Sequence, residues 1–272
     1  MPLSITTNPA AGTAARALEI ANSNLTDSLK RLSTGKRIAN PYDDAGGEAV
    51  QLKMGAAITR YGTTKRNIQN AISFLQVQDG VLQTAVGIVS RMADLRTMAD
   101  DVSKSSSDIE NYDREFQVLQ TQLNNLDSEE FNGTGIFSIN KTVYTSEQGT
   151  AGPSVTFGSM SITQGGFSVA ASDTSTYTSL TSLATSHLTA DLQQLANARA
   201  QNGAYQSVMN YAYDNASIGK TNLEAARSRI ADVDIAEESG KFASNQILAQ
   251  AASSMLAQAN NINRSSLLTL LG

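Results

Sequence analysis

Residues 108–127 read DIENYDREFQVLQTQLNNLD, and their apolar side chains recur in alternating steps of three and four. The positions that carry this pattern are Ile109, Tyr112, Phe116, Leu119, Leu123 and Leu126. Steps of three and four place side chains on one face of an α-helix. The stretch therefore predicts an amphipathic helix that buries this face against other helices.

The same period recurs on both sides of this stretch. It extends from about Glu48 to Asp101, and it resumes at about Thr185 and continues to Ile230, interrupted at Asn202-Gly203. In the first of these segments the pattern is carried by Ile68, Ile72, Leu75, Leu82, Val86, Val89 and Ala93. Helical patterns of this length are typical of rods and coiled coils. We therefore predict a mainly α fold, a long antiparallel helical bundle.

Two further helical stretches near the ends of the sequence have narrower apolar faces. Each carries apolar residues seven positions apart with many alanines between them, so neither can form a domain alone. The simplest partner for each is the other, and the apolar edges that remain predict association with further copies. The predicted assembly interface consists of Leu18, Leu25, Leu29, Leu32, Leu248, Met255, Ile262, Leu267, Leu268, Leu270 and Leu271.

Three segments lack the helical period. RLSTGKRIANPYDDAGG (31–47) contains Gly35, Asn40-Pro41 and a glycine pair, which predict turns, and ADVDIAEESG (231–240) is also irregular. Residues 132–182 are rich in Ser, Thr and Gly. Within them the alternating stretches are TVYTS (142–146), SVTFG (154–158) and SMSIT (159–163). They predict one or two β-hairpins, and a disordered Ser/Thr linker is the alternative.

Composition excludes several classes of protein. The 272 residues carry a net charge of −5, and the 20 basic residues are scattered, which disfavours nucleic acid as a partner. Without cysteine there are no disulfides, thiolate metal sites or Cys nucleophiles. No apolar run approaches the ~20 residues of a transmembrane helix, so we expect no membrane partner. MPLSITTNPAAG also lacks the features of a secretory signal.

The sequence offers little material for catalysis. His187 is the single histidine, so a zinc site is not expected, and no G-x-S-x-G accompanies a triad built from His187, Asp191 and a serine. The acidic residues cluster at Asp43, Asp44, Asp232, Asp234, Glu237 and Glu238. These clusters lack a calcium-loop pattern, and we interpret them as partners of helix N-termini and basic side chains. We predict no catalytic, cofactor or metal site and no enzyme activity.

Five strings resemble bacterial flagellin, in the same order and spacing. They are RLSTGKRIANPYDDAGGEAV (31–50), EFNGTGIF (130–137), RAQNGAYQS (199–207), NLEAARSRIADVDIAEES (222–239) and SSMLAQANNINRSSLLTLLG (253–272). The resemblance covers roughly residues 1–137 and the last 75 to 85 residues. STGKRIANPYDD (33–44) is also similar to the flagellin-like hook–filament junction protein, which is the alternative. FNGTGIF and the string at 253–272 fit flagellin better.

The resemblance implies a structural subunit that polymerises into the flagellar filament for motility. It also implies an inner coiled-coil part, D0, an outer rod, D1, and a small central insert. The implied boundaries are 1–33 and 239–272 for D0, 34–46 and 231–238 for the linkers, 47–137 and 184–230 for D1, and 138–183 for a short β-hairpin or variable insert.

The resemblance further implies a route and a set of partners. The chain would leave the cell by type III export without a cleaved signal peptide and act extracellularly. Besides other copies of itself, it would meet an export chaperone on residues about 240–272, the filament cap and the hook-junction proteins. We expect the terminal arms to be disordered in the free monomer and helical in the filament.

SRMADLRTMAD (90–100) is similar to the flagellin segment that an animal innate immune receptor contacts. Arg91 and Leu95 match that motif, and its acidic partner would align with Gln117 or Val118. The alternative is that these residues belong to the helix core and a solvated face.

Overall fold

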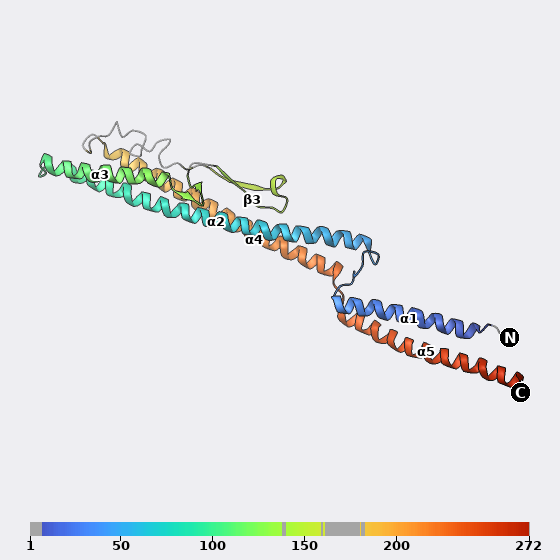
Figure 1. Cartoon of the computed structure of the whole chain (residues 1–272). Helices are drawn as coiled ribbons and strands as arrows, with labels where there is room; N and C mark the ends of the chain where they lie inside the picture. The colour runs from blue at the N-terminus through green and yellow to red at the C-terminus, as the bar shows by residue number, and fades with distance from the viewer. Residues whose placement is uncertain (1–6, 138–139, 159, 161–179, 181–182, 272) are drawn as a thin grey trace. The chain divides into compact units, whose positions relative to one another are not determined.

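The computed structural model describes residues 7–137, 140–158, 160, 180 and 183–271, with side chains up to residue 265. Its helices are long and follow the predicted periods (Figure 1). Their bounds are Pro9–Thr34 for α1, Ala45–Ala99 for α2, Ser106–Asp127 for α3, Thr185–Ala231 for α4 and Ile235–Leu271 for α5. The mainly α fold class is confirmed.

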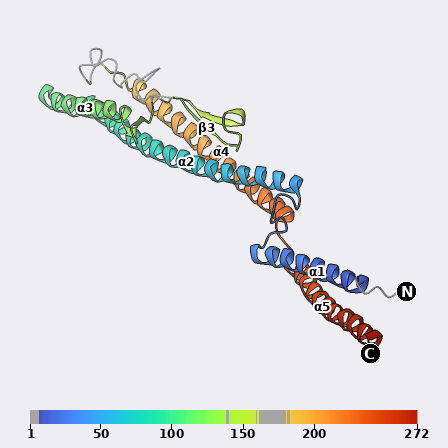
Figure 2. The same cartoon turned by 45° about the vertical axis from the view of Figure 1, so that its right-hand side comes forward.

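The chain divides into two compact units. One comprises Met1–Ala56 together with Asn222–Gly272, and the other comprises Ala57–Thr221. The first brings the two terminal segments of the sequence into one body, where α1 lies beside α5 in both views (Figures 1 and 2). The second contains α3, most of α2 and α4, and the strands.

Residues 108–127 form nearly all of α3 and supply part of the larger core cluster. Phe116, Leu123 and Leu126 are buried there among residues of α2 and α4, as the three-four period predicts. The helix begins with a capping box: the Ser105 hydroxyl accepts from the Asp108 N–H, and the Asp108 carboxylate accepts from the Ser105 N–H at 3.0 Å. Such a reciprocal pair satisfies N–H groups that the first helical turn leaves free.

A second cluster lies earlier in α2 and later in α4. Ile68 and Leu75 of α2 are buried against Met209 and Ala216 of α4, with Phe157 beside them. By length and composition alone α2 could cross a membrane, the one such helix among the described residues. Several of its apolar residues, Ile68, Leu75 and Leu82 among them, are buried in these two clusters.

The predicted hairpin between TVYTS and SVTFG is confirmed. Strand β3, Lys141–Tyr144, pairs antiparallel with β4, Ser154–Phe157, and a short 3-10 helix, Gly149–Ala151, lies between them. Phe157 anchors the hairpin, since it is buried with its ring centroid 5.2 Å from that of Tyr205. SMSIT lies outside the described residues apart from Met160.

A smaller hairpin was not predicted. Strand β1, Glu130–Phe131, pairs with β2, Thr134–Gly135, around Asn132-Gly133. Both turn residues have positive φ, +53° and +72°. An Asn-Gly pair favours a turn of this kind, so this dipeptide was the signal that could have found the hairpin.

Three boundaries differ from the sequence expectation. Helix α2 includes Gly46 and Gly47 in its first turn, and a Cβ on Gly47 would lie 2.8 Å from Ile38 Cδ1, so glycine permits close packing here. Helix α4 continues through Asn202-Gly203, and α5 begins at Ile235, which leaves only residues 232–234 between these helices.

Candidate assembly interface

Helices α1 and α5 form an antiparallel pair, with hydrogen bonds between the two segments near each end of the pair. Asn8 caps α1 by accepting from the Ala11 N–H at 3.0 Å, and its Nδ2 donates to the Ala259 carbonyl oxygen at 3.1 Å. At the opposite end the Arg37 N–H donates to the Ala231 carbonyl oxygen at 2.7 Å. Residues about 250 positions apart in the chain are thereby held side by side.

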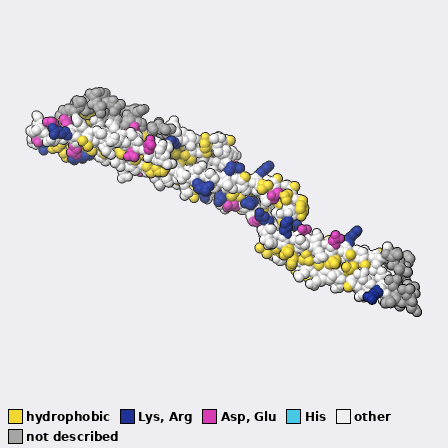
Figure 3. All heavy atoms as spheres, in the orientation of Figure 1, with side chains coloured by type: hydrophobic (Ala, Val, Ile, Leu, Met, Phe, Trp, Pro, Cys, Tyr) yellow, Lys and Arg dark blue, Asp and Glu magenta, His cyan; other side chains and the backbone are white. Residues whose placement is uncertain are grey.

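Small side chains make the closest part of this pair. Ala21 and Ser28 of α1 and Ala252 of α5 are buried, whereas Leu18, Leu25 and Leu32 are only half-buried. Alanine and serine cover little area, so much apolar surface along the pair is left without a cover in the single chain. The space-filling view shows apolar side chains along these helices (Figure 3).

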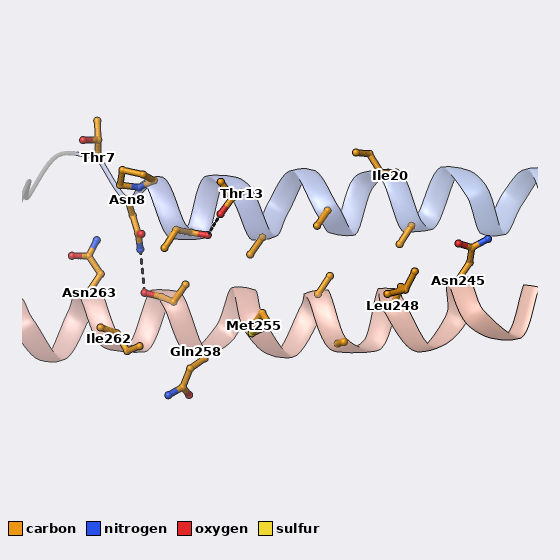
Figure 4. Close-up of a pocket in the computed structure, with 18 of the residues that line it drawn as sticks. Thr7, Asn8, Thr13, Ile20, Asn245, Leu248, Met255, Gln258, Ile262 and Asn263 are labelled. Atoms are coloured by element: carbon orange, nitrogen blue, oxygen red, sulfur yellow. Dashed lines mark hydrogen bonds between the residues drawn. The ribbon is translucent and has the colours of Figure 1, made fainter. Parts of the chain in front are cut away.

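An apolar groove of about 1020 Å³ runs along the pair (Figure 4). Its apolar lining comes from both helices in similar numbers. The apolar lining residues are Pro9, Ala10, Ala14, Ala17, Ile20, Ala21, Leu248, Ala251, Ala252, Met255, Ala259 and Ile262. A continuous exposed apolar groove of this kind is typical of a binding surface.

The predicted interface residues do not all lie where the heptads suggested. Leu29, Leu248, Met255 and Ile262 are 57%, 54%, 67% and 57% exposed, so they are not buried by the pairing of α1 with α5. The buried row on α5 includes Ala252, and small residues there allow close approach of the helices. Leu267, Leu268, Leu270 and Leu271 belong to the last turns of α5, and their side chains lie outside the described part of the chain.

One acidic cluster lies between α1 and α2, and the other lies at the junction of α4 and α5. Asp44 accepts from the Gly47 N–H at 2.8 Å in the first turn of α2, and Asp234 accepts from the Ala236 N–H at 2.9 Å in the first turn of α5. Arg37 Nη2 lies 3.6 Å from an Asp44 carboxylate oxygen. These contacts confirm the interpretation as helix-end partners. Among the described residues no three acidic or histidine side chains are grouped as metal ligands.

The two candidate receptor contacts lie in different environments. Arg91 is exposed and pairs with Glu115 at 2.8 Å, so Glu115 is the acidic neighbour of Arg91 in place of Gln117 or Val118. The pKa of Arg91 is raised, chiefly by the hydrogen bond to this carboxylate. Leu95 is 0% exposed inside the larger core cluster. A direct surface contact through Leu95 therefore does not fit this structure.

Long amphipathic helices, together with a terminal pair that leaves an apolar groove open, are the features of a self-associating helical rod protein. Family comparison gives a specific result. Residues 5–142 match the bacterial flagellin N-terminal helical region, and residues 185–271 match the bacterial flagellin C-terminal helical region. The chain belongs to the bacterial flagellin family. Flagellins are structural subunits of the flagellar filament, an extracellular appendage, and this chain is a subunit of that kind.

Two relatives match most of the chain in sequence. It is 32% identical to a flagellar filament 30.7 kDa core protein of Treponema maltophilum, covering 90% of this chain and 92% of the relative. It is also 32% identical to a flagellin of Halalkalibacterium halodurans, over 85% and 86% of the two chains. The crystal structure of Bacillus cereus flagellin aligns with a TM-score of 0.47 and 24% identity, over 60% of this chain and 94% of that one. The hook–filament junction alternative is not favoured.

Proposed function

We propose that the groove between α1 and α5 is the surface through which this flagellin polymerises. The main support for this proposal is that Leu248, Met255 and Ile262 are exposed along one side of an apolar groove that the single chain leaves open. Burying one such side chain contributes roughly 1.5–3 kcal/mol. Several of them, repeated over neighbouring copies, would offset much of the entropy lost in ordering the terminal helices.

Leu18, Leu25, Leu29 and Leu32 on α1 belong to the same proposed interface, as do Leu267, Leu268, Leu270 and Leu271. In this proposal residues 1–33 and 239–272 form D0, residues 47–137 and 184–230 form D1, and residues 34–46 and 231–238 link them. Residues 138–183 form the insert. The chain carries out no catalysis, and its activity is assembly.

We also propose an export route and further partners, by analogy with the family. The chain is exported by the type III route without a cleaved signal peptide, and an export chaperone holds residues about 240–272 before assembly. The filament cap and the hook-junction proteins then contact the growing polymer. Support for the chaperone site comes from α5, whose exposed apolar residues need a cover before polymerisation.

Seeded elongation tests the groove directly. Met255→Asp places a charge on an exposed side chain that lines the groove, so the monomer should keep its helix content and fail to elongate wild-type seeds. Ser254→Asp is the matched control, because Ser254 is an exposed neighbour that does not line the groove. Elongation is followed by light scattering and by electron microscopy. Normal elongation by the Met255→Asp chain would rule out this surface.

Receptor activation is a separate proposal and rests on Arg91 alone at the surface. Purified monomer is applied to reporter cells that carry the animal receptor, beside an Arg91→Ala variant. A response that falls with the variant supports a contact at Arg91. No response at saturating wild-type protein would end the proposal.

A further inference from the structure

The sequence contains two Asn-Gly pairs, and the fold places them in opposite environments. Asn132-Gly133 forms the exposed turn between β1 and β2, whereas Asn202-Gly203 lies within α4. Both pairs lie in the unit Ala57–Thr221. Glycine after asparagine leaves the backbone nitrogen uncrowded, so the two pairs have the same intrinsic chemistry and differ only in their surroundings.

The turn at Asn132 leaves the reacting groups accessible. Both turn residues are exposed, and within the described residues no hydrogen bond engages the Asn132 side-chain amide or the Gly133 N–H. The strands on either side are two residues each. A hairpin this short is marginally stable, so the turn opens without unfolding the core.

The side chain of Asn202, in contrast, is held by hydrogen bonds. The residue is 0% exposed, and its Nδ2 donates to the Leu75 carbonyl oxygen at 3.1 Å and to Gln78 Oε1 at 2.7 Å. Its Oδ1 accepts from Gln206 Nε2 at 2.6 Å. The amide of the following glycine lies inside a continuous helix, where backbone N–H groups are hydrogen-bonded. Reaction at this pair requires local unfolding of α4.

We propose that Asn132 is a site of spontaneous deamidation in the folded chain, with water as the co-reactant. The Gly133 nitrogen attacks the side-chain carbonyl carbon of Asn132 and forms a C–N bond. The bond to the amide nitrogen breaks, and ammonia leaves with the proton that Gly133 gives up. One water then opens the five-membered imide at either carbonyl, which yields aspartate or isoaspartate at position 132.

The two products have different structural consequences. Aspartate tolerates positive φ, so it keeps the turn and adds one negative charge. Isoaspartate adds a backbone carbon to a two-residue turn, which breaks the pairing of Phe131 with Thr134. That pairing holds the Phe131 ring edge-on to Phe74, with centroids 6.0 Å apart. The modified fraction therefore rises with the age of a subunit, and isoaspartate loosens the hairpin.

The experiment compares the two pairs within one sample. Native chain is incubated in mildly alkaline buffer and digested under mildly acidic conditions, and the deamidated fraction of each peptide is measured by mass spectrometry. Because Asn202 reacts only after local unfolding, conversion at Asn132 should be about tenfold faster or more in native chain. In denaturant the two rates should become similar. Asn132→Gln should abolish the fast signal and leave the Asn202 peptide unchanged.

Equal rates at the two pairs in the native chain would overturn the proposal. So would a difference that persists in denaturant, because sequence and not fold would then set the rates. Neither measurement depends on polymerisation, so this result stands apart from the proposed function.

Discussion

The guanidinium of Arg37 donates two hydrogen bonds to the backbone carbonyl oxygen of Ile230, at 3.1 Å from Nε and 2.8 Å from Nη2. Ile230 lies in the last turn of α4, where carbonyl groups lack partners within the helix. The same guanidinium pairs with Asp44, which caps the first turn of α2. One side chain thus joins the end of one long helix to the start of another.

Replacing Arg37 with glutamine should weaken the unit formed by Met1–Ala56 and Asn222–Gly272. The variant loses charge-assisted bonds that are partly exposed, so we expect a loss of about 1 kcal/mol in the free energy of unfolding. Because we expect the terminal arms to be ordered only in the polymer, urea unfolding of polymerised chain, followed by circular dichroism, measures this loss. Arg16→Gln, on the exposed face of α1, is the control and should change little. Equal effects of the two variants would contradict a special role for Arg37.

Replacing Asn202 with alanine should destabilise the second unit. The change leaves Gln78 Oε1 without this donor in a buried site and removes one hydrogen bond to the Leu75 carbonyl oxygen, which costs about 1–3 kcal/mol. Chemical denaturation of the purified chain measures it. Gln201→Ala alters an exposed neighbour in the same helix and should stay within about 0.5 kcal/mol. A similar loss from both would show that helix propensity, and not the amide, is responsible.

The capping box of α3 should give a pH-dependent signal. Hydrogen bonds from the Ser105 side chain and N–H lower the pKa of Asp108. Its contribution to stability is therefore complete above the pKa of the unfolded chain and is lost as pH falls through the folded pKa. Ser105→Ala should raise the Asp108 pKa toward its ordinary value, as measured by NMR titration of the carboxyl carbon. Ser106→Ala should leave it unchanged, and an unshifted pKa in Ser105→Ala would refute the assignment.

Limited proteolysis should trim the free monomer at both ends, to a core of roughly residues 45–235. The expectation rests on α1 and α5 being covered only on one side in the single chain, with large apolar residues exposed. Mass spectrometry of the digest identifies the cut sites, and polymerised chain should resist cleavage under the same conditions. Resistance of the monomer at both termini would refute coupled folding of these arms.

Leu267→Asp or Leu268→Asp should leave the folded core intact and prevent polymer growth. A carboxylate at either position would have to be buried without a partner in the proposed interface. Thermal unfolding followed by circular dichroism checks the core, and elongation of wild-type seeds checks assembly. Filaments of normal yield from either variant would remove these leucines from the interface.

Local patterns predicted most of the elements. The three-four period of residues 108–127 and the alternation of 154–158 depend on side chains a few positions apart, and both became the expected helix and strand. The β1–β2 hairpin was missed because its strands are too short to show alternation. Helix α4 continues through Asn202-Gly203 because a distant partner, Gln78, satisfies the asparagine amide.

On α5 the sequence by itself determined that a helix with heptad spacing is present. It could not determine which row of that helix faces α1. Leu248, Met255 and Ile262 are seven apart, and so are Asn245, Ala252 and Ala259, so spacing alone favours neither row. Tertiary structure decided between them: the row of small residues packs against α1, because small side chains allow close approach of two helices. The large side chains are left exposed beside the groove, available to another copy of the chain.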